Sequence, residues 1–359
     1  MSIFDDLKTK FDRFIDLAQA RVRSQPWLVV TLMHEYFRHL YPSDPYLPFP
    51  EADSASARIS SVLDACIGGF EAASPLGSYF VGRPGCMEGI VARLAAAGRK
   101  RADEATTQQV YGKLWDAFDV DVYTKEALQI LRERLETGDF RLSSLKGAKV
   151  LDMGCGSGRY AIALAMCGAA RVHGVDLGAA SIETGAAIAQ RTGLSNIEFH
   201  TGNVLELPYR DGEFDFVFCN GVLHHTTNME QGIRELHRVL KPGGRAFLYL
   251  YADGGLFWYS RKKMPVVMKQ IPQEYTMAVL QLLGMPSNRF VFVDNWYVPI
   301  ERHTSRAYLE QFLRETGFAA VVKIHSGRAT DLDNSSLRSR PDAEVLWGDG
   351  EHRYLLTKA

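Results

Sequence analysis

The pattern of apolar and polar residues changes near residue 146. From there to the end of the chain, short apolar runs alternate with longer segments of helical periodicity. The apolar residues Met229, Ile233, Leu236 and Leu240, for example, have the spacing of one buried helix face. Such alternation predicts an α/β fold, in which helices cover both faces of a sheet. The predicted strands are one ending at 150–151 and those at 171–176, 197–200, 214–219, 246–251, 318–325 and 353–358, and the predicted helices are at 160–167, 179–192, 229–240 and 307–316.

Residues 1 to about 105 have a helical pattern without the strand-like runs. In the first predicted helix Phe4, Leu7, Phe11, Phe14 and Leu17 share one face, and the helical pattern breaks at 41–45. We therefore predict two domains. A mainly α-helical N-terminal domain at 1–105 would cap a site or mediate dimerisation, and an α/β domain would occupy 106–359.

The most distinctive motif is the glycine-rich segment VLDMGCGSGRY, which begins at Val150. Its glycines let the backbone turn tightly beneath a ligand, between a strand and a helix. A dinucleotide fingerprint would have its third glycine at the position of Arg159. Asp152, two residues before the first glycine, would repel a pyrophosphate and hold a cationic amino group. The motif therefore favours a nucleoside-type ligand with a positive end.

Together with the segments that follow, this loop resembles the first motif of the class I S-adenosylmethionine-dependent methyltransferases of the small-molecule, methyltransferase-11-like type. Asp176 ends the second predicted strand, at the separation where such folds bind ribose hydroxyls. The segments NGVLHHT, from Asn220, and LKPGG, from Leu240, follow in the order of the family. Family members usually have an aspartate where this chain has Asn203, whose amide oxygen can make the same hydrogen bond to adenine. The resemblance spans about 146–251.

The resemblance implies a cofactor, a sheet and a set of contacts. The cofactor is S-adenosylmethionine. The sheet is Rossmann-like and seven-stranded, with helices on both faces and with its last strand antiparallel beside the fifth. The implied cofactor-binding residues are Asp152, Gly154, Gly156, Gly158, Asp176, Asn203, Val204 and Asn220.

A hydroxyl or ammonium acceptor must lose a proton on methylation, and histidine is the side chain best suited to accept it near neutral pH. His225 and His224 follow the fourth predicted strand, and His303 is a rival further along the chain. The His-His-Thr string occurs in family members with unlike substrates, so its histidines could serve only to shape the loop. Tyr123 ends an aromatic segment at 111–123 that either closes over the cofactor, as a helix does in related enzymes, or packs as a buried docking helix.

The insertion at 253–300 is a second candidate cover. It mixes aromatic residues such as Phe257, Trp258 and Trp296 with basic ones. Such a mixture can enclose an apolar substrate and hold an acidic group, as an aromatic lid would. It is equally typical of core residues with a solvated basic edge.

The composition limits the function classes further. Lys and Arg number 41 against 42 Asp and Glu, which gives no general attraction to nucleic acid or to an anionic membrane. The acidic N-terminus lacks a signal region, and five cysteines without a C-x-x-C pair indicate neither a disulfide framework nor a zinc site. His34 and His39 are five residues apart, one more than H-E-x-x-H requires. We expect a cytoplasmic enzyme without a bound metal, with homo-oligomerisation left open.

The sequence therefore predicts an enzyme that transfers a methyl group from S-adenosylmethionine to the oxygen, nitrogen or sulfur of a small molecule enclosed under helical and aromatic covers. A protein or RNA methyltransferase is the first alternative, but it would favour a basic face or an open cleft. A non-catalytic protein that binds S-adenosylmethionine is the second, and the intact glycine loop and acid pair argue against it.

Overall fold

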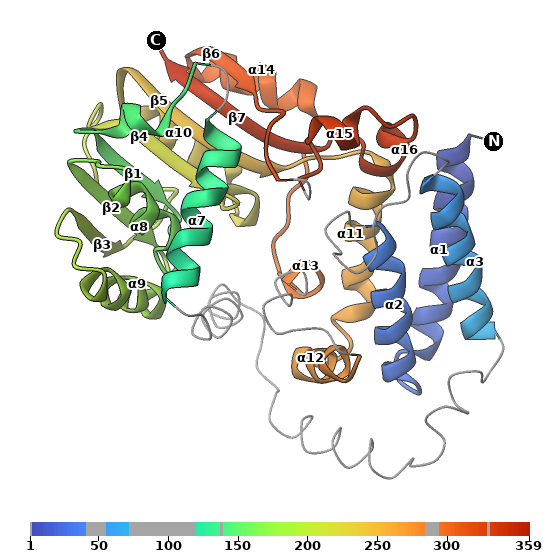
Figure 1. Ribbon diagram of the computed structural model, residues 1–359. Helices are drawn as coiled ribbons and strands as arrows, with labels where there is room; N and C mark the ends of the chain where they lie inside the picture. The colour runs from blue at the N-terminus through green and yellow to red at the C-terminus, as the bar shows by residue number, and fades with distance from the viewer. Residues whose placement is uncertain (1, 41–54, 72–119, 137–138, 284–293, 329–330) are drawn as a thin grey trace. The chain divides into compact units, whose positions relative to one another are not determined.

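The computed structural model describes the chain except for residues 1, 41–54, 72–119, 137–138, 284–293 and 329–330 (Figure 1). The chain divides into two compact units. The first comprises 1–102, 254–298 and 338–348, and the second comprises 103–253, 299–337 and 349–359. The predicted domain boundary near 105 lies outside the described residues.

The second unit contains a seven-stranded sheet in the order β3-β2-β1-β4-β5-β7-β6. The strand β7 is antiparallel to both of its neighbours, and the other pairs are parallel. The predicted fold class is thus confirmed, including the antiparallel last strand beside the fifth. The strands are β1 (Lys149–Met153), β2 (Arg171–Asp176), β3 (Ile197–Thr201), β4 (Phe214–Asn220), β5 (Leu240–Tyr251), β6 (Phe318–Lys323) and β7 (Glu351–Lys358).

Helices cover both faces of this sheet because its central strands are apolar on both sides. The neighbouring residues Val150 and Leu151 of β1 illustrate this, since they belong to separate hydrophobic cores on opposite faces. The face of Val150 packs against α7 (Val120–Leu135), α8 (Arg159–Met166) and α9 (Ala179–Arg191). The face of Leu151 packs against α10 (Met229–Val239) and α14 (Arg306–Thr316). Shorter helices are η1 (Leu142–Leu145), η2 (Leu223–His225) and α15 (Ser335–Arg338).

The strand β5 is longer than the sequence suggested. Its predicted start was Ala246, with the preceding Lys-Pro-Gly-Gly segment as a helix stop, but β5 begins at Leu240, directly after α10. Leu240 pairs with Phe214 and Arg245 with Phe216, so the extra residues of β5 form an irregularity in the ladder. The proline and glycines therefore end the helix and bend the strand.

The first unit is helical, as predicted for the N-terminal region, but it is built from three chain segments. Tyr36 Oη lies 2.6 Å from Ser260 Oγ, and the ring of Phe37 lies 6.0 Å from that of Phe257. Trp347 Nε1 donates to the Leu40 carbonyl at 3.4 Å. The helices of this unit are α1 (Ile3–Arg21), α2 (Pro26–Leu40), α3 (Ala55–Glu71), α11 (Gly255–Met268), α12 (Gln273–Leu282), α13 (Asp294–Tyr297) and α16 (Ala343–Trp347).

The aromatic residues of the insertion contribute to this helical core. Phe257, Trp258 and Trp296 are each at most 1% exposed. For these three side chains the packing corresponds to the core interpretation of the insertion.

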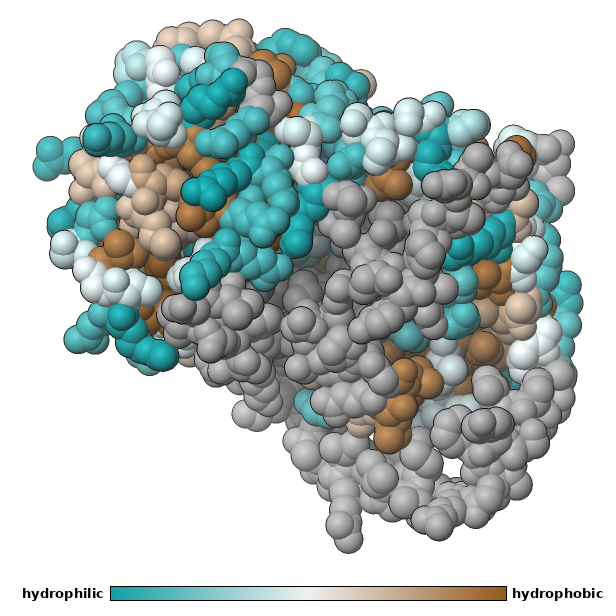
Figure 2. Space-filling view, viewed as in Figure 1, coloured by the Kyte–Doolittle hydropathy of each residue, from teal (hydrophilic) through white to brown (hydrophobic). Residues whose placement is uncertain are grey.

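The surface of the described residues is mixed in character. In the face shown in Figure 2, hydrophilic residues dominate the second unit, and the hydrophobic ones are scattered between them. Among the described helices, none combines the length and the apolar character that a membrane span requires.

Candidate active site

The glycine loop connects β1 to α8 at the carboxyl edge of the sheet. The backbone N–H groups of Gly154 and Cys155 both donate to the Val175 carbonyl, at 2.8 and 2.9 Å, which fixes the loop against β2. Gly154 has φ +79°, and a Cβ there would lie 2.4 Å from Val222 side-chain atoms. At Gly156, by contrast, an added Cβ would have no heavy atom within 4 Å. The loop is thus tightly packed at its start and open in its middle, as a ligand cradle requires.

Gly158 closes the loop as the residue preceding α8. It has φ +82°, and a Cβ there would lie 2.5 Å from the ring of Phe199. Both the conformation and the close approach exclude a side chain at this position. The helix α8 can therefore begin directly behind the loop, with its N-terminus beside it.

The carboxylate of Asp176 holds this loop from the end of β2. One oxygen accepts a hydrogen bond from Gly156 N at 2.8 Å and the other from Gly178 N at 2.9 Å. Burial raises the pKa of Asp176, although the two backbone N–H groups act in the opposite direction. Each carboxylate oxygen can accept a further hydrogen bond, so the contact predicted with ribose hydroxyls is compatible with these bonds.

Two buried oxygen atoms nearby have no hydrogen-bond partner among the described residues. They are Asp152 Oδ2, at the end of β1, and Asn220 Oδ1, at the end of β4. Burial and the neighbouring Asp176 raise the pKa of Asp152 to about 8. Burying two such acceptors lowers the stability of the protein unless a donor forms hydrogen bonds with them. A cationic donor is the most favourable partner for a buried carboxylate.

The remaining predicted cofactor residues, Asn203 and Val204, follow β3. Asn203 is exposed, and its Oδ1 accepts from Leu205 N at 2.9 Å, which leaves one lone pair and the amide N–H groups for a ligand. The Val204 side chain is buried in the core on the α10 face, so only its backbone could contact a cofactor.

The three candidate histidines gather around Tyr251, the last residue of β5. The His224 ring stacks on the Tyr251 ring with centroids 3.6 Å apart, and His225 lies edge-on at 5.3 Å. The His303 ring is 6.1 Å from the Tyr251 ring. The structure thus brings His303 next to His224 and His225, from which it is almost 80 residues away in the sequence.

Hydrogen bonds distinguish the histidines. His225 Nδ1 lies 2.8 Å from the Ile300 carbonyl, which can only accept. His303 Nδ1 faces the Ala252 carbonyl at 3.0 Å and its Nε2 faces a Glu301 carboxylate oxygen at 2.9 Å. His224 is fully buried, with its carbonyl accepting from Arg302 N at 2.9 Å. The neutral ring of His225 therefore carries its proton on Nδ1 and its lone pair on Nε2, whereas His303 faces an acceptor from each nitrogen.

Comparison with known proteins agrees with this geometry. A family model described as a methyltransferase domain matches residues 144–282. A demethylmenaquinone methyltransferase of Listeria monocytogenes is 30% identical over 52% of this chain and 76% of its own length. The chain belongs to the class I S-adenosylmethionine-dependent methyltransferases. A demethylmenaquinone methyltransferase of Lactococcus lactis is 28% identical over 58% of the chain and 81% of its length, and an O-methyltransferase of Aspergillus nomiae is 30% identical over 39% and 62%.

The residues of this methyltransferase fit the family's cofactor. The positive end of S-adenosylmethionine matches the buried oxygen atoms Asp152 Oδ2 and Asn220 Oδ1, which have no hydrogen-bond partner among the described residues. The open backbone at Gly156 leaves room for a ligand next to Asp176. The contacts themselves remain predictions from the motif and the geometry.

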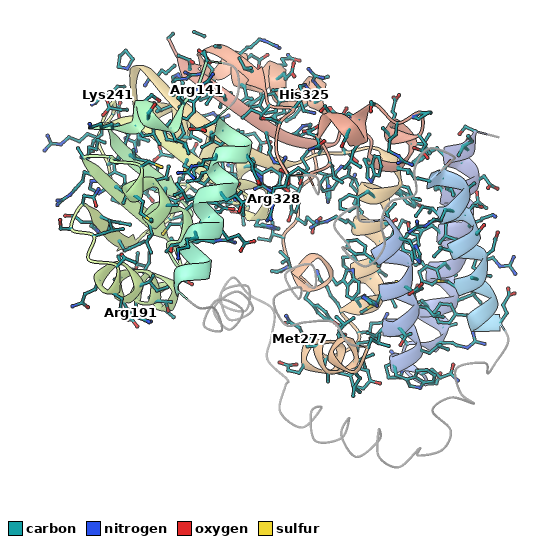
Figure 3. All side chains as sticks on the ribbon, viewed as in Figure 1. Arg141, Arg191, Lys241, Met277, His325 and Arg328 are labelled. Atoms are coloured by element: carbon teal, nitrogen blue, oxygen red, sulfur yellow. The ribbon has the colours of Figure 1, made fainter. Side chains whose placement is uncertain are left out.

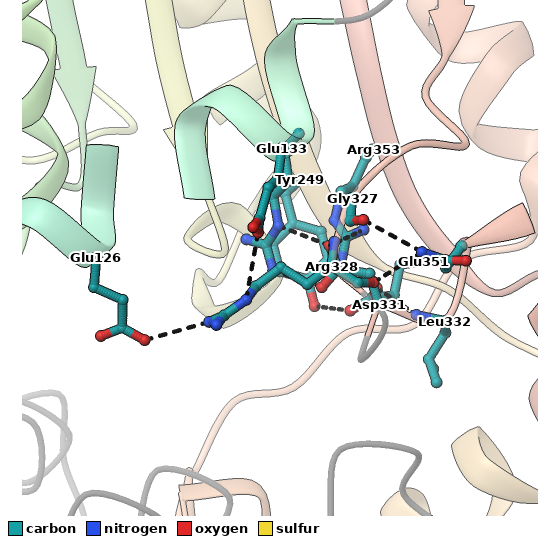
Figure 4. A network of polar contacts seen from close by, with 11 residues as sticks. Glu126, Glu133, Tyr249, Gly327, Arg328, Asp331, Leu332, Glu351 and Arg353 are labelled. Carbon is teal, nitrogen blue, oxygen red and sulfur yellow. Dashed lines mark hydrogen bonds and ion pairs between the residues drawn. The ribbon is translucent and has the colours of Figure 1, made fainter. Parts of the chain in front are cut away.

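Sequence reasoning missed a buried charge network in the methyltransferase, shown in Figure 4. Arg353, which is fully buried in β7, contacts Glu351 and lies 2.9 Å from Asp331 Oδ2. Arg134 of α7 donates to both Asp331 oxygens, to Oδ1 at 2.7 Å and to Oδ2 at 2.9 Å. Burial raises the pKa of Asp331, but the two guanidinium groups outweigh it and lower that pKa overall. The only sequence signal was a Glu-x-Arg pair in a strand that otherwise has the pattern of a buried one.

This network reaches the histidine cluster through Tyr249, whose hydroxyl donates to Glu351 Oε1 at 2.8 Å and whose ring lies 6.0 Å from that of His224. It reaches the glycine-loop helix through α7, because Glu126 binds Arg159 of α8 at 2.7 Å. Arg328, labelled in Figure 3, contacts the same Glu126 at 3.3 Å. The network thus connects α7 with both parts of the candidate site.

Tyr123 lies in the first turn of α7, but its side chain and the aromatic segment before it are outside the described part of the chain. Its predicted contact with cofactor or substrate stays a prediction. Tyr123 therefore belongs to the same helix as Arg134, whose guanidinium group takes part in the charge network.

Proposed function

We propose that this methyltransferase transfers a methyl group from S-adenosylmethionine to an oxygen, nitrogen or sulfur atom of a small molecule, with His225 as the base. The observation that carries the proposal is the hydrogen bond from His225 Nδ1 to the Ile300 carbonyl. That bond fixes the tautomer, so the neutral ring presents the lone pair on Nε2. A base with a fixed orientation is what proton removal from an acceptor requires.

Two observations support a small-molecule acceptor. Two of the relatives are named for demethylmenaquinone, which is a small molecule, and a third is named as an O-methyltransferase. The charge of the chain is balanced, with a formal net charge of −1. An enzyme acting on RNA would favour a strongly basic face.

The cofactor, when bound, supplies a methyl group on a positively charged sulfur that an in-line nucleophile can displace. The protein's part is to hold and align it. Asp152 and Asn220 would accept from its amino group, and Asp176 from its ribose hydroxyls. The Gly154 to Gly158 loop would line it with backbone alone, because side chains are excluded at both ends of the loop.

The other two histidines suit different roles. Each nitrogen of His303 faces an oxygen atom, so this ring is best placed to link the Ala252 carbonyl to the Glu301 carboxylate. His224 is fully buried and stacked on Tyr251, which suits it to shaping the loop. His225 and His303 are both only partly buried, and the Ile300 carbonyl places the proton of neutral His225 on Nδ1 and its lone pair on Nε2.

The helical first unit is proposed to select the acceptor or to mediate self-association, because the glycine loop, the acids and the histidine cluster all belong to the second unit. Light scattering of the purified protein distinguishes the two roles. A monomeric protein would contradict self-association, so that acceptor selection would be the remaining role of this unit.

The proposal is tested in two steps. The full-length enzyme is first incubated with methyl-labelled S-adenosylmethionine and a metabolite extract of its host, and the small molecule that gains label is identified. With that substrate, His225→Gln should lower kcat about 10²- to 10⁴-fold at nearly unchanged cofactor affinity, since the loss belongs to the transition state. The fall in wild-type rate toward low pH should disappear in the variant.

His303→Gln is the matched control, because it changes a neighbouring histidine that is not proposed to accept the proton. It should retain far more activity than His225→Gln. Normal turnover of His225→Gln would contradict the assignment of the base, and label found only in protein or RNA would contradict the small-molecule acceptor.

A further inference from the structure

Three potential metal ligands meet on one face of the sheet, at its β3 edge. His173 of β2 is directly opposite Glu198 of β3, and His200 follows two residues later on the same side. Glu198 Oε2 lies 3.8 Å from His173 Nδ1 and 3.6 Å from His200 Nε2. One ligand atom from each of the three residues lies within 4.8 Å of the others. The register of the parallel pair therefore makes the three side chains converge.

The buried histidine of this group lacks the hydrogen bonds that its position demands. His173 is 8% exposed, and neither of its ring nitrogens makes a hydrogen bond with a described residue. Buried polar side chains in folded proteins nearly always have a partner. The hydroxyl of Tyr209 is a second buried polar atom without a hydrogen bond to a described residue, and its ring lies 5.4 Å from that of His173.

The distances suit an ion between the ligands better than direct hydrogen bonds. Separations above 3.5 Å are too long for a hydrogen bond between imidazole and carboxylate. Zinc lies about 2.0–2.2 Å from nitrogen and oxygen ligands, so two ligands on a tetrahedral ion are about 3.4 Å apart. Separations of 3.6 and 3.8 Å need only a small side-chain movement to reach that value.

The neighbouring cations leave the converging oxygen available. Arg171 forms an ion pair with the other oxygen of Glu198, Oε1. Lys149 is paired with Glu213 at 2.6 Å. The positive charges beside the cluster are thus balanced by carboxylate oxygens that are not part of it. The His200 side chain is 45% exposed, which gives an ion access from solvent.

We propose that His173, Glu198 and His200 bind one divalent transition-metal ion of the zinc class, with water completing the coordination. Two imidazoles and a carboxylate form an established zinc ligand set, and such mixed nitrogen and oxygen sites disfavour calcium and magnesium. The ion ties the edge strand β3 to β2. Because Gly202 and Asn203 follow β3 directly, it also anchors the loop predicted to contact the adenine of the cofactor. The inference departs from the sequence expectation of no metal and stands apart from the proposed methyl transfer.

The test uses full-length protein without an affinity tag, stripped of metal and titrated with Zn²⁺ by calorimetry. We expect about one ion per chain. His200→Ala removes a half-exposed ligand, so it should fold normally by circular dichroism and lose at least about a hundredfold in zinc affinity, because even loss of a hydrogen-bonding partner of a ligand costs about 10- to 100-fold. Glu198→Gln keeps the size of the side chain and should show a similar loss.

His237→Gln is the matched control, because His237 is a partly buried histidine outside the cluster and belongs to α10. It should bind zinc as the wild type does. Substitution with Co²⁺ gives a second readout, since a visible absorption band from a tetrahedral cobalt site should appear in the wild type and be absent in His200→Ala. Equal zinc affinity in the wild type and His200→Ala would overturn the proposal, as would a wild type that binds no zinc at micromolar concentrations.

Discussion

Replacing Asp152 by asparagine is expected to stabilise the cofactor-free protein, most strongly above neutral pH. Burial and Asp176 raise the pKa of Asp152 from 3.8 to about 8. In the unfolded chain this carboxyl has its ordinary pKa, so between about pH 4 and pH 8 the folded protein keeps a proton that the unfolded chain has released. The unfolded state binds fewer protons in this window, and the free energy of unfolding therefore falls as the pH rises.

The size of the change in the free energy of unfolding follows from the difference in the pKa of Asp152 between the folded and the unfolded state. One pKa unit corresponds to about 1.4 kcal/mol, and the interval from pH 5 to pH 8 covers most of the displaced range. Asp152 alone should thus lower the wild-type free energy of unfolding by about 3.5 kcal/mol over that interval. An asparagine has no proton to lose. The stability advantage of Asp152→Asn over the wild type should therefore grow by about 3.5 kcal/mol between pH 5 and pH 8.

Hydrogen exchange measured by mass spectrometry is the suitable assay, because it reports the opening free energy of peptides from β1 and β4 separately from the helical unit. S-adenosylmethionine should reduce the difference between the two proteins, since a cation beside the carboxylate favours its charged form. Asp152→Asn should bind the cofactor about 10- to 100-fold more weakly, because it lacks the charged acceptor. If both proteins show the same pH dependence, Asp152 is ionised in the free enzyme and the reasoning is wrong.

Three further predictions follow from the same structure. Asp176→Ala should raise the dissociation constant for S-adenosylmethionine about a hundredfold, because two hydrogen bonds to a charged acceptor contribute on the order of 3 kcal/mol; calorimetry measures this against Glu183→Ala, and unchanged binding would remove Asp176 from the site. Arg353→Leu should destabilise the protein by about 3–5 kcal/mol, because it leaves buried carboxylates without their cation, and an unaltered Tm would refute this. Deletion of residues 1–102 should give insoluble protein, because Phe257 and its neighbours in the insertion lose their helical partners; a soluble, monodisperse product would show that the insertion packs without them.

The sequence was most informative where structure depends on neighbouring residues. The strand β2 and the helix α9 lie within one residue of their predicted bounds, because periodicity and the terminating glycines are local signals. The glycine loop could also be predicted from the sequence, because the spacing of its glycines follows from the backbone conformation of the turn. The start of β5 was not, because the pairing of Leu240 with Phe214 depends on a distant strand.

The parts that sequence reasoning did not predict depend on tertiary placement. The aromatic residues of the insertion fit a lid and a core equally well by composition, and only packing distinguishes the two. The convergence of His173 and Glu198 required the register of β2 and β3, which no local pattern contains. The position of His225 relative to Tyr251 likewise depends on how the end of β4 meets the end of β5.

The three-segment construction of the helical unit sets an order of events during synthesis. Helices α1 to α3 are complete at Glu71, but α16, whose Trp347 donates to the Leu40 carbonyl, begins about 270 residues later at Ala343. At about 5–20 residues per second, the early helices wait roughly 15 to 55 s for this partner. During that time the surface that α16 covers in the folded unit is available to chaperones and to other nascent chains. Completion of the helical unit therefore depends on α16 having left the ribosome.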